Sequence, residues 1–210
     1  MLNAVARVSD HFPKSFVPLA VAALLLAGCQ QDGLAQDPAT GATVGRTTVV
    51  PATCPPAGTI VQGGPVTLLY QGRNPNNQEQ CMVSGRAAWH GISINPADAA
   101  LLRSVFPPAP GRRGSRTFQG STGAWRETFE VVDQRQVTVP AGTFDVWVIR
   151  RVQERMFEAA GRGVETIYLE RDTGMMVRRD IIFDTNWGGA NTPFEATRVV
   201  RPRPAAEQRR

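Results

Sequence analysis

Apolar and polar residues alternate through much of the second half of the chain, which is typical of β-strands. In residues 124–134, Trp125 and Phe129 fall on one side of the predicted strand, and charged or polar residues fall on the other. Runs rich in β-branched, aromatic and leucine residues predict further strands at 66–72 and 194–200. The dominant predicted element is therefore the strand.

Two longer segments each contain a pair of strands joined by a tight turn. Residues 135–156 turn at 140–142, where the sequence is Pro-Ala-Gly, and residues 164–184 turn at 172–174, where it is Asp-Thr-Gly. Proline presets the backbone for such a turn, and glycine accepts the conformation that other residues resist. Successive strands with short turns predict an antiparallel meander.

One segment, residues 95–108, breaks the strand pattern and predicts a helix. Asn95 can cap it, Pro96 suits its first turn, and Asp98 complements the positive helix start. Its apolar positions at helical spacing are Leu101, Leu102, Val105 and Phe106. We expect a mainly β fold: a single curved antiparallel sheet, a half-barrel-like meander, with one or few helices on its concave face.

Both faces of this sheet carry large apolar residues in places. Phe144 and Val146 share one face, and Trp147 and Ile149 share the other. We favour a sheet covered on both sides by its own helix and loops. The alternative is a concave face that lines a cavity for an apolar ligand, with four candidate lining residues: Trp125, Phe129, Phe144 and Val146.

The N-terminus carries an apolar run at residues 16–28, preceded by Arg7 and Lys14 and closed by small residues. This run is shorter than the roughly 20 residues of a membrane-spanning helix and has the pattern of a secretory signal peptide. Its last residues, Leu26-Ala27-Gly28-Cys29, resemble the lipobox of bacterial lipoproteins. The alternative is a plain signal peptide with an incidental cysteine.

The lipobox resemblance implies that Cys29 is acylated on sulfur and becomes the first mature residue, which anchors the protein to a membrane by its lipid. Gln30 follows, where an aspartate retains enterobacterial lipoproteins at the inner membrane. The resemblance therefore implies a cell-envelope protein on the periplasmic face of the outer membrane.

Composition divides the remaining chain into three parts. Residues 29–52 hold few large apolar residues and predict a flexible tether, residues 53–201 form one β-rich domain, and residues 202–210 form a disordered basic tail. The net charge of +5 lies outside residues 29–197, because these contain 16 basic and 16 acidic residues. This balance argues against nucleic acid as a partner.

Two cysteines remain after Cys29, namely Cys54 and Cys81. In an oxidising compartment two cysteines most simply form one disulfide. A metal site is the alternative, but it needs more ligands, and His90 is the one histidine after the signal peptide. We expect a disulfide and no metal or cofactor.

The segments VTVPAGTFDVWVIRR (137–151) and VETIYLERDTGMMVRRD (164–180) resemble uncharacterised bacterial envelope proteins of the DUF3108-like type. Those proteins are similar to the lipoprotein-carrier group that includes LolA and LolB. The resemblance covers about a third of the chain. It implies an open, curved half-barrel with helices on its concave side that binds lipid or acyl chains.

Candidate catalytic residues have simpler structural interpretations. The Asp172-Thr173-Gly174 sequence matches the core of aspartic proteases but lies where a hairpin needs a turn. We interpret His90 as a packed or surface histidine, and GSTG at 120–123 lacks the spacing of a serine elbow. Carboxylates that alternate with arginines are interpreted as cross-strand ion pairs on a solvated face: Glu127, Glu130, Asp145 and Asp180. No catalytic residue is assigned.

Three functions follow from these patterns. The first is a non-enzymatic envelope lipoprotein that docks on another envelope component. The alternative is a carrier of an apolar ligand, such as a lipid or a lipoprotein acyl chain, in a half-barrel cavity. An unrecognised hydrolase is the least favoured.

Overall fold

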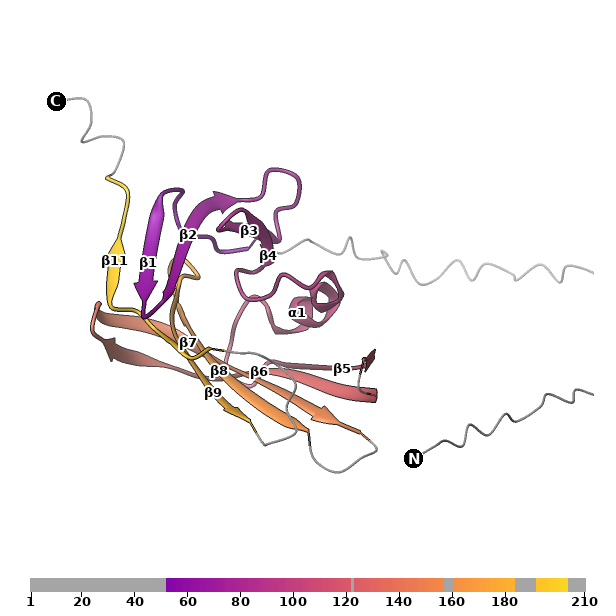
Figure 1. The fold of residues 1–210 in the computed structure, drawn as a ribbon. Coiled ribbons are helices and arrows are strands. Elements are labelled where there is room, and N and C mark those ends of the chain that lie inside the picture. The colour runs from indigo at the N-terminus through magenta and orange to yellow at the C-terminus, as the bar shows by residue number, and fades with distance from the viewer. Residues whose placement is uncertain (1–51, 122, 157–160, 184–191, 204–210) are drawn as a thin grey trace, which may run out of the picture. The chain divides into compact units, whose positions relative to one another are not determined.

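The strands form two antiparallel sheets accompanied by one short helix (Figure 1). The computed structural model describes residues 52–121, 123–156, 161–183 and 192–203. The predicted mainly β fold with few helices is confirmed, but the strands divide into two sheets instead of forming one. The predicted signal peptide, Cys29 and nearly all of the predicted tether and tail lie outside the described residues.

The five-stranded sheet has the order β11-β1-β2-β3-β4. Its first strands form a hairpin in which Val61 lies opposite Leu68. Its strands are β1 (Thr59–Gly63), β2 (Val66–Arg73), β3 (Gln80–Val83), β4 (Arg86–Trp89) and β11 (Arg198–Val200). Four of them come from the start of the described chain and one from its end.

The six-stranded sheet has the order β10-β9-β8-β7-β6-β5, and its strands β5 to β9 form the predicted meander. Its strands are β5 (Arg113–Gly120), β6 (Gly123–Val139), β7 (Gly142–Arg155), β8 (Arg162–Glu170), β9 (Met176–Phe183) and β10 (Phe194–Glu195). Both predicted turns are confirmed, because β6 ends and β7 begins around residues 140–141, and residues 171–175 separate β8 from β9.

The two sheets join where the chain passes from β10 to β11. Only residues 196 and 197 separate the two strands, yet β10 pairs with β9 and β11 pairs with β1. Gly63 is needed at this crossing, because a Cβ there would lie 2.2 Å from the Glu195 carbonyl oxygen. The final strands therefore connect the sheets.

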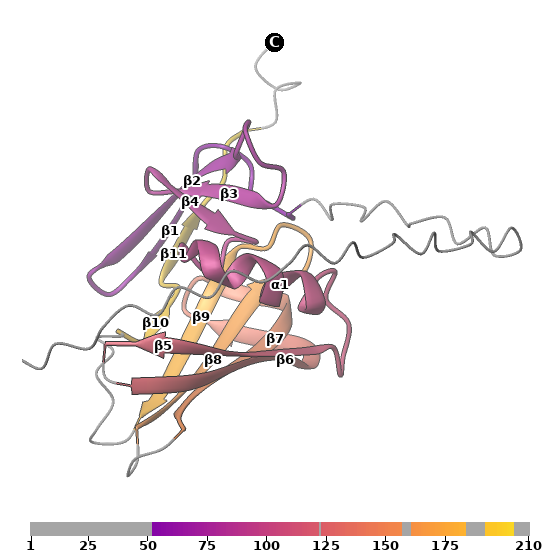
Figure 2. The same cartoon turned by 90° about the vertical axis from the view of Figure 1, so that its right-hand side faces the viewer.

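The predicted helix is present as a 3₁₀ turn, η1 (Pro96–Asp98), followed by α1 (Ala99–Val105). The Asn95 side chain accepts a hydrogen bond from the Ala97 backbone N–H, as its position as a cap predicts. The helix packs against β5 and β6 (Figure 2). Gly114 allows this approach, since a Cβ there would lie 1.9 Å from Ser104 Oγ.

Two apolar clusters bury parts of both sheets. One lies under α1 and contains Leu101, Leu102, Val105, Phe106, Phe129, Val131, Ile149, Ile167 and Leu169; we call it the apolar cluster. The other joins the two sheets and includes Val61, Tyr70, Val146 and Val148. Val148 and Ile149 are adjacent but enter different clusters, so both faces of β7 are buried, as the sequence interpretation favoured.

The predicted disulfide is present between Cys54 and Cys81, with their Cα atoms 5.5 Å apart. It ties the segment before β1 to β3. Within the described part of the chain, no helix has the length and apolar character needed to cross a bilayer.

Candidate functional site

A cavity of about 560 Å³ lies between the two sheets. Its volume falls within the range of small-molecule binding sites. Its apolar lining comes from both sheets and the loop after β4: Leu68, Tyr70, Val83, Ala88, Ile92, Ile94, Ile167 and Met176. Its polar lining consists of Ser84, Arg86, Ser93, Asn95, Arg151, Glu165 and Arg179. The cavity therefore presents apolar and charged surface to the same occupant.

The loop at residues 90–95 forms part of the wall because the chain reverses sharply after β4. His90 and Gly91 both have positive φ angles, 46° and 72°, and Ser93 returns to bridge Trp89. Glycine adopts this conformation readily, whereas histidine adopts it only where surrounding contacts hold it. Here the His90 ring stacks on Phe106, with ring centroids 4.1 Å apart.

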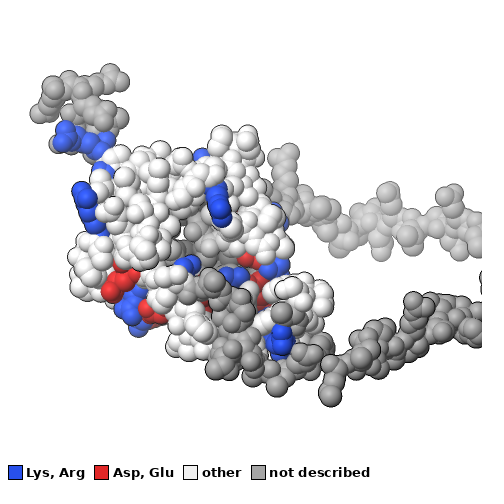
Figure 3. Space-filling model, viewed as in Figure 1, with Lys and Arg blue, Asp and Glu red and all other residues white. Residues whose placement is uncertain are grey.

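A row of alternating charges crosses the six-stranded sheet on the face that carries the apolar cluster. We call it the charged row, and one residue from each strand β5 to β9 forms it: Arg116, Glu127, Arg151, Glu165 and Arg179. Strand register creates the row, because Arg116 lies opposite Glu127 and Arg151 lies opposite Glu165. Figure 3 shows blue and red side chains together over the part of the surface that this sheet forms.

Glu127 is the most enclosed member of the charged row and is fully buried. It accepts hydrogen bonds from Arg116 Nε at 2.8 Å, Arg151 Nε at 2.7 Å and Gln153 Nε2 at 2.6 Å. Burial by itself would raise the pKa of Glu127, but Arg151 and Arg116 outweigh it and hold the pKa below its usual range. Glu127 is therefore a buried carboxylate kept charged by its partners.

Asp98 joins the charged row from the start of α1. Arg116 donates to its Oδ1, and Ser93 Oγ donates to its Oδ2 at 2.5 Å. Burial raises the pKa of Asp98; the Ser93 hydrogen bond opposes this, and the nearby Glu127 carboxylate adds to it. From the sequence, Asp98 was expected only to complement the positive start of the helix. In the structure it also binds Arg116, and this contact links the start of α1 to the six-stranded sheet.

Arg179 ends the charged row at the cavity. Its Nη1 lies 4.0 Å from Glu165 Oε1, and its Nη2 donates to the Thr192 carbonyl oxygen at 2.7 Å. Glu165 is held more closely by Arg151, whose Nη1 donates to Glu165 Oε2 at 2.9 Å. The row is thus tightly paired at its centre and loosely paired at Arg179.

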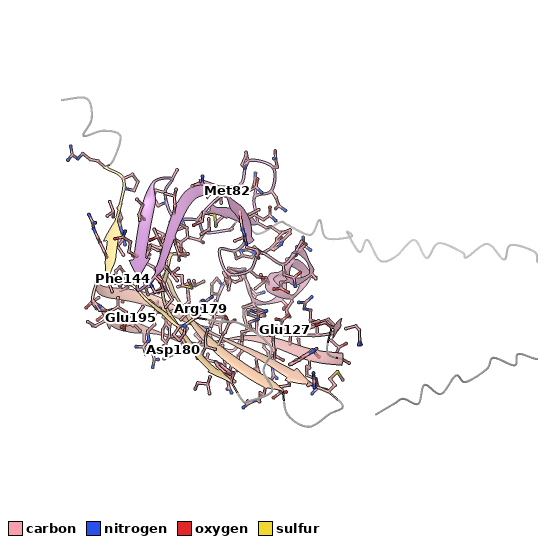
Figure 4. The ribbon with its side chains drawn as sticks, in the orientation of Figure 1. Met82, Glu127, Phe144, Arg179, Asp180 and Glu195 are labelled. Atoms are coloured by element: carbon pink, nitrogen blue, oxygen red, sulfur yellow. A yellow bond between two sulfur atoms is a disulfide. The ribbon has the colours of Figure 1, made fainter. Side chains whose placement is uncertain are left out.

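The four residues predicted to line an apolar site do not meet in one cavity. Phe129 is buried in the apolar cluster, whereas Val146 and Phe144 belong to the cluster that joins the sheets. Trp125 is buried on β6, with Arg155 over its ring. None of the four lines the cavity between the sheets. Figure 4 shows Phe144 at the opposite end of the six-stranded sheet from Glu127.

The interpretation of the acidic residues needs two corrections. Glu127 was expected on a solvated face, but it is fully buried in the charged row. The pattern of alternation identified two faces and could not tell which one α1 would cover. Asp180 pairs with Arg178, whose Nε donates to it at 2.8 Å, but both residues lie on β9, so the pair lies along one strand and not across two.

Two candidate catalytic groups have the structural roles expected of them. Asp172 lies in the turn between β8 and β9, and His90 is a packed histidine that does not line the cavity. Burial lowers the pKa of His90 to about 4. Among the described residues, no group of histidine, cysteine and carboxylate side chains could hold a metal ion.

The sequence interpretation missed Arg151, Glu165 and Arg179 as site residues. A signal was present, because Glu165 has the same strand parity as the buried Ile167 and Leu169. The cavity itself had no such signal, since its walls come from both sheets.

In comparisons with protein-family models, with curated proteins and with solved structures, no match to this chain was found. Function is therefore inferred from the cavity and its lining. The described residues at the cavity provide apolar walls, hydrogen-bond donors and cations. Such a set of groups is suited to holding a ligand by contact and charge.

Proposed function

We propose that this protein is a non-enzymatic, lipid-anchored envelope protein that binds a small amphipathic ligand between its two sheets. The cavity of about 560 Å³ is the observation that carries the proposal. It is large enough for a small ligand and is lined by side chains from both sheets. This is the ligand-binding alternative of the sequence analysis, with the site moved from the predicted concave lining to the space between the sheets.

The mixed lining supports an amphipathic ligand over a purely apolar one. Leu68, Ile167 and Met176 offer apolar contact, whereas Arg151 and Glu165 line the same space. A purely apolar occupant would remove water from these charges without replacing its hydrogen bonds, which is costly. A ligand with one apolar and one polar part avoids that cost.

The anchoring part of the proposal rests on the resemblance of Leu26-Ala27-Gly28-Cys29 to a lipobox. An acylated Cys29 would hold the domain at a membrane surface, and a flexible tether of residues 29–52 would give it a reach of about 25 Å. The Cys54–Cys81 disulfide agrees with an oxidising compartment. The outer membrane is the location implied by Gln30.

Docking on another envelope component stays a prediction. The exposed apolar residues Leu69 and Val200 lie on either side of Ile60 in the five-stranded sheet. A short row of apolar side chains like this one is normal on the surface of a monomeric protein and specifies no partner. Ligand binding is therefore preferred.

Two adjacent leucines on β2 allow a matched test of the cavity. Leu68 lines the cavity, whereas Leu69 is 38% exposed and does not line it. Leu68→Trp should fill the space and remove binding, and Leu69→Trp should leave binding intact. The measurement is native mass spectrometry of the full chain purified from the cell envelope, followed by solvent extraction of bound small molecules.

A stoichiometric small molecule in the wild type and Leu69→Trp, absent from Leu68→Trp, supports the proposal. Equal occupancy in all three proteins contradicts the site. If all three are empty and none takes up added octanoate or octanol, the ligand-binding function itself is wrong.

The anchor is tested separately with Cys29→Ser. We expect this variant to lose metabolic labelling by a palmitate analogue, because the lipid-bearing sulfur is gone. Labelling that persists in the variant contradicts the anchor.

A further inference from the structure

We infer that the ligand carries an anionic head group, a carboxylate or a phosphate monoester on an apolar chain, and that Arg179 binds it. This inference rests on the proposed ligand-binding function and adds the ligand's charge. It depends on the charge balance of the cavity and on the unequal pairing along the charged row.

The ionisable residues of the cavity wall are three arginines and one glutamate: Arg86, Arg151, Arg179 and Glu165. Arg151 and Glu165 are paired with each other at 2.9 Å, and Arg151 is also bonded to Glu127. Their charges are compensated inside the protein. With Asp98 included, the charged row has three arginines and three carboxylates, so the net positive charge at the cavity is that of Arg86, and Arg179 is the row's arginine with the longest carboxylate contact.

Arg179 is the member of the charged row with the weakest pairing. A guanidinium has five N–H donors. Among the described residues, Arg179 uses one hydrogen bond, to the Thr192 carbonyl oxygen at 2.7 Å, and its carboxylate neighbour Glu165 stands 4.0 Å away. Its Nε is buried without an acceptor among those residues. Arg179 is partly buried, with 26% of its side chain exposed. A guanidinium with unused donors and a buried Nε without an acceptor favours an anion that accepts hydrogen bonds.

Arg86 extends the positive charge to the rim of the cavity. It begins β4, is exposed, and forms no ion pair with another described residue. Ser84 and Asn95, which also line the cavity, add polar groups nearby. The rim therefore adds a second cation and polar groups to the lining of the same cavity.

The apolar lining determines the remainder of the ligand. Leu68, Tyr70 and Val83 from the five-stranded sheet share the cavity with Ile167 and Met176 from the six-stranded sheet. A short hydrocarbon chain buried among them gains contact area without any polar partner. The chemical class is thus an alkyl or acyl chain with a single acidic head.

The test uses the full chain in lipid nanodiscs, titrated calorimetrically with octanoate, octyl phosphate or 1-octanol, with empty nanodiscs as the reference. We expect either anion to bind about ten- to a hundredfold more tightly than 1-octanol, because the alcohol lacks the charge that Arg179 pairs with. The two anions distinguish the source of the charge, a carboxylate or a phosphate.

Neighbouring arginines on β9 provide the matched variants. Arg179→Gln should weaken anion binding about tenfold or more and leave 1-octanol binding unchanged. Arg178 pairs with Asp180 and does not line the cavity. Arg178→Gln should therefore change the affinity for the anions and for 1-octanol by no more than about twofold. If Arg179→Gln fails to fold, Arg86→Gln at the exposed rim should weaken anion binding several-fold.

The outcomes separate this inference from the proposed function. If 1-octanol binds as tightly as both anions, or if Arg179→Gln and Arg178→Gln behave alike, the anionic head group is wrong while ligand binding stands. If none of the three compounds binds above the empty nanodisc, both the inference and the proposed function are wrong.

Discussion

The face of the six-stranded sheet under α1 is buried in two chemically different ways. In the apolar cluster, Leu102, Val131 and Ile149 are fully buried, and their side chains pack by apolar contact. In the charged row a few residues away, Glu127 is buried just as completely but is surrounded by Arg116 and Arg151. Strands β6, β7 and β8 contribute residues to both regions, so the two regions differ in the kind of side chain that is buried and not in the strands that carry it.

The difference lies in directionality. Apolar contacts depend on volume and tolerate exchange of one apolar side chain for another. Buried ion pairs depend on each partner, because removal of one leaves an uncompensated charge in a medium that solvates it poorly. The charged row therefore depends on the strand register that brings its partners together, and it ends in a cation at the cavity.

The largest expected effect comes from breaking the charged row at Glu127. Glu127→Gln leaves Arg116 and Arg151 without their shared carboxylate, and we expect a loss of about 3–5 kcal/mol in the free energy of unfolding. Urea denaturation followed by circular dichroism measures it.

Glu154→Gln on β7 is the matched control, because the Arg162–Glu154 pair is about half exposed, with exposed side-chain fractions of 51% and 43%. We expect a change below about 1 kcal/mol there. If Glu127→Gln and Glu154→Gln lose the same free energy of unfolding, a buried ion pair in the charged row contributes no more than an exposed one.

The apolar cluster is tested with Leu102→Ala. Leu102 is fully buried, so truncation leaves a cavity, and we expect a loss of about 3 kcal/mol. Leu69→Ala serves as the control, since Leu69 is 38% exposed, and should cost less than about 1 kcal/mol. A Leu102→Met variant should retain most of the stability; a loss as large as that of Leu102→Ala would contradict the tolerance expected of this region.

A smaller effect is expected where α1 approaches the sheet at Gly114. The added Cβ in Gly114→Ala would lie 1.9 Å from Ser104 Oγ and 2.8 Å from Leu101 Cδ1. We expect a loss of about 1–3 kcal/mol, because the helix must move away from β5. Thermal unfolding measures it. Ser104→Ala in the same chain removes Oγ without placing a glycine in α1 and should recover part of the loss. If stability does not recover, the contact with Ser104 is not the source of the strain.

The smallest effect concerns pH and His90. Burial lowers the pKa of His90 to about 4 from 6.5, with the nearby Glu79 carboxylate opposing and Arg103 assisting. The unfolded chain therefore takes up a proton below pH 6.5 before the folded chain does, and stability falls as the pH drops from 6.5 towards 4. Between pH 7.0 and 5.5 we expect His90 to account for a loss of about 1 kcal/mol, given the shift from 6.5 to about 4.

Urea unfolding of the wild type and His90→Asn at both pH values isolates this loss. Asparagine tolerates the positive φ of 46° and does not titrate. An identical pH dependence of the two proteins would contradict the assignment to His90.

Local signals predicted the elements that depend on neighbouring residues. The Pro-Ala-Gly turn at 140–142, the Asn95 cap and the Cys54–Cys81 disulfide are all present. Each depends on a short stretch with its own conformational preference or, for the disulfide, on the count of available partners. Alternation also identified two faces on β7, and both are buried.

The site could not be predicted in the same way. Phe144 and Phe129 were assigned to one apolar lining, yet they belong to different clusters, because strand parity is defined only within a strand. Glu127 was assigned to a solvated face because it is charged, although the residues two positions away on the same face of the strand, such as Phe129, are apolar. Its burial depends on Arg116 and Arg151, which register brings to it from two other strands.

The sequence by itself determined that this chain folds mainly as β-strands with short turns and one short helix, and that its cysteines can pair. These features follow from period, propensity and residue count. The tertiary structure decided that the strands form two sheets, because β1 pairs with β11 from the other end of the chain. The cavity lies between these sheets, and the register of β9 against β8 places the end of the charged row, Arg179, in its wall.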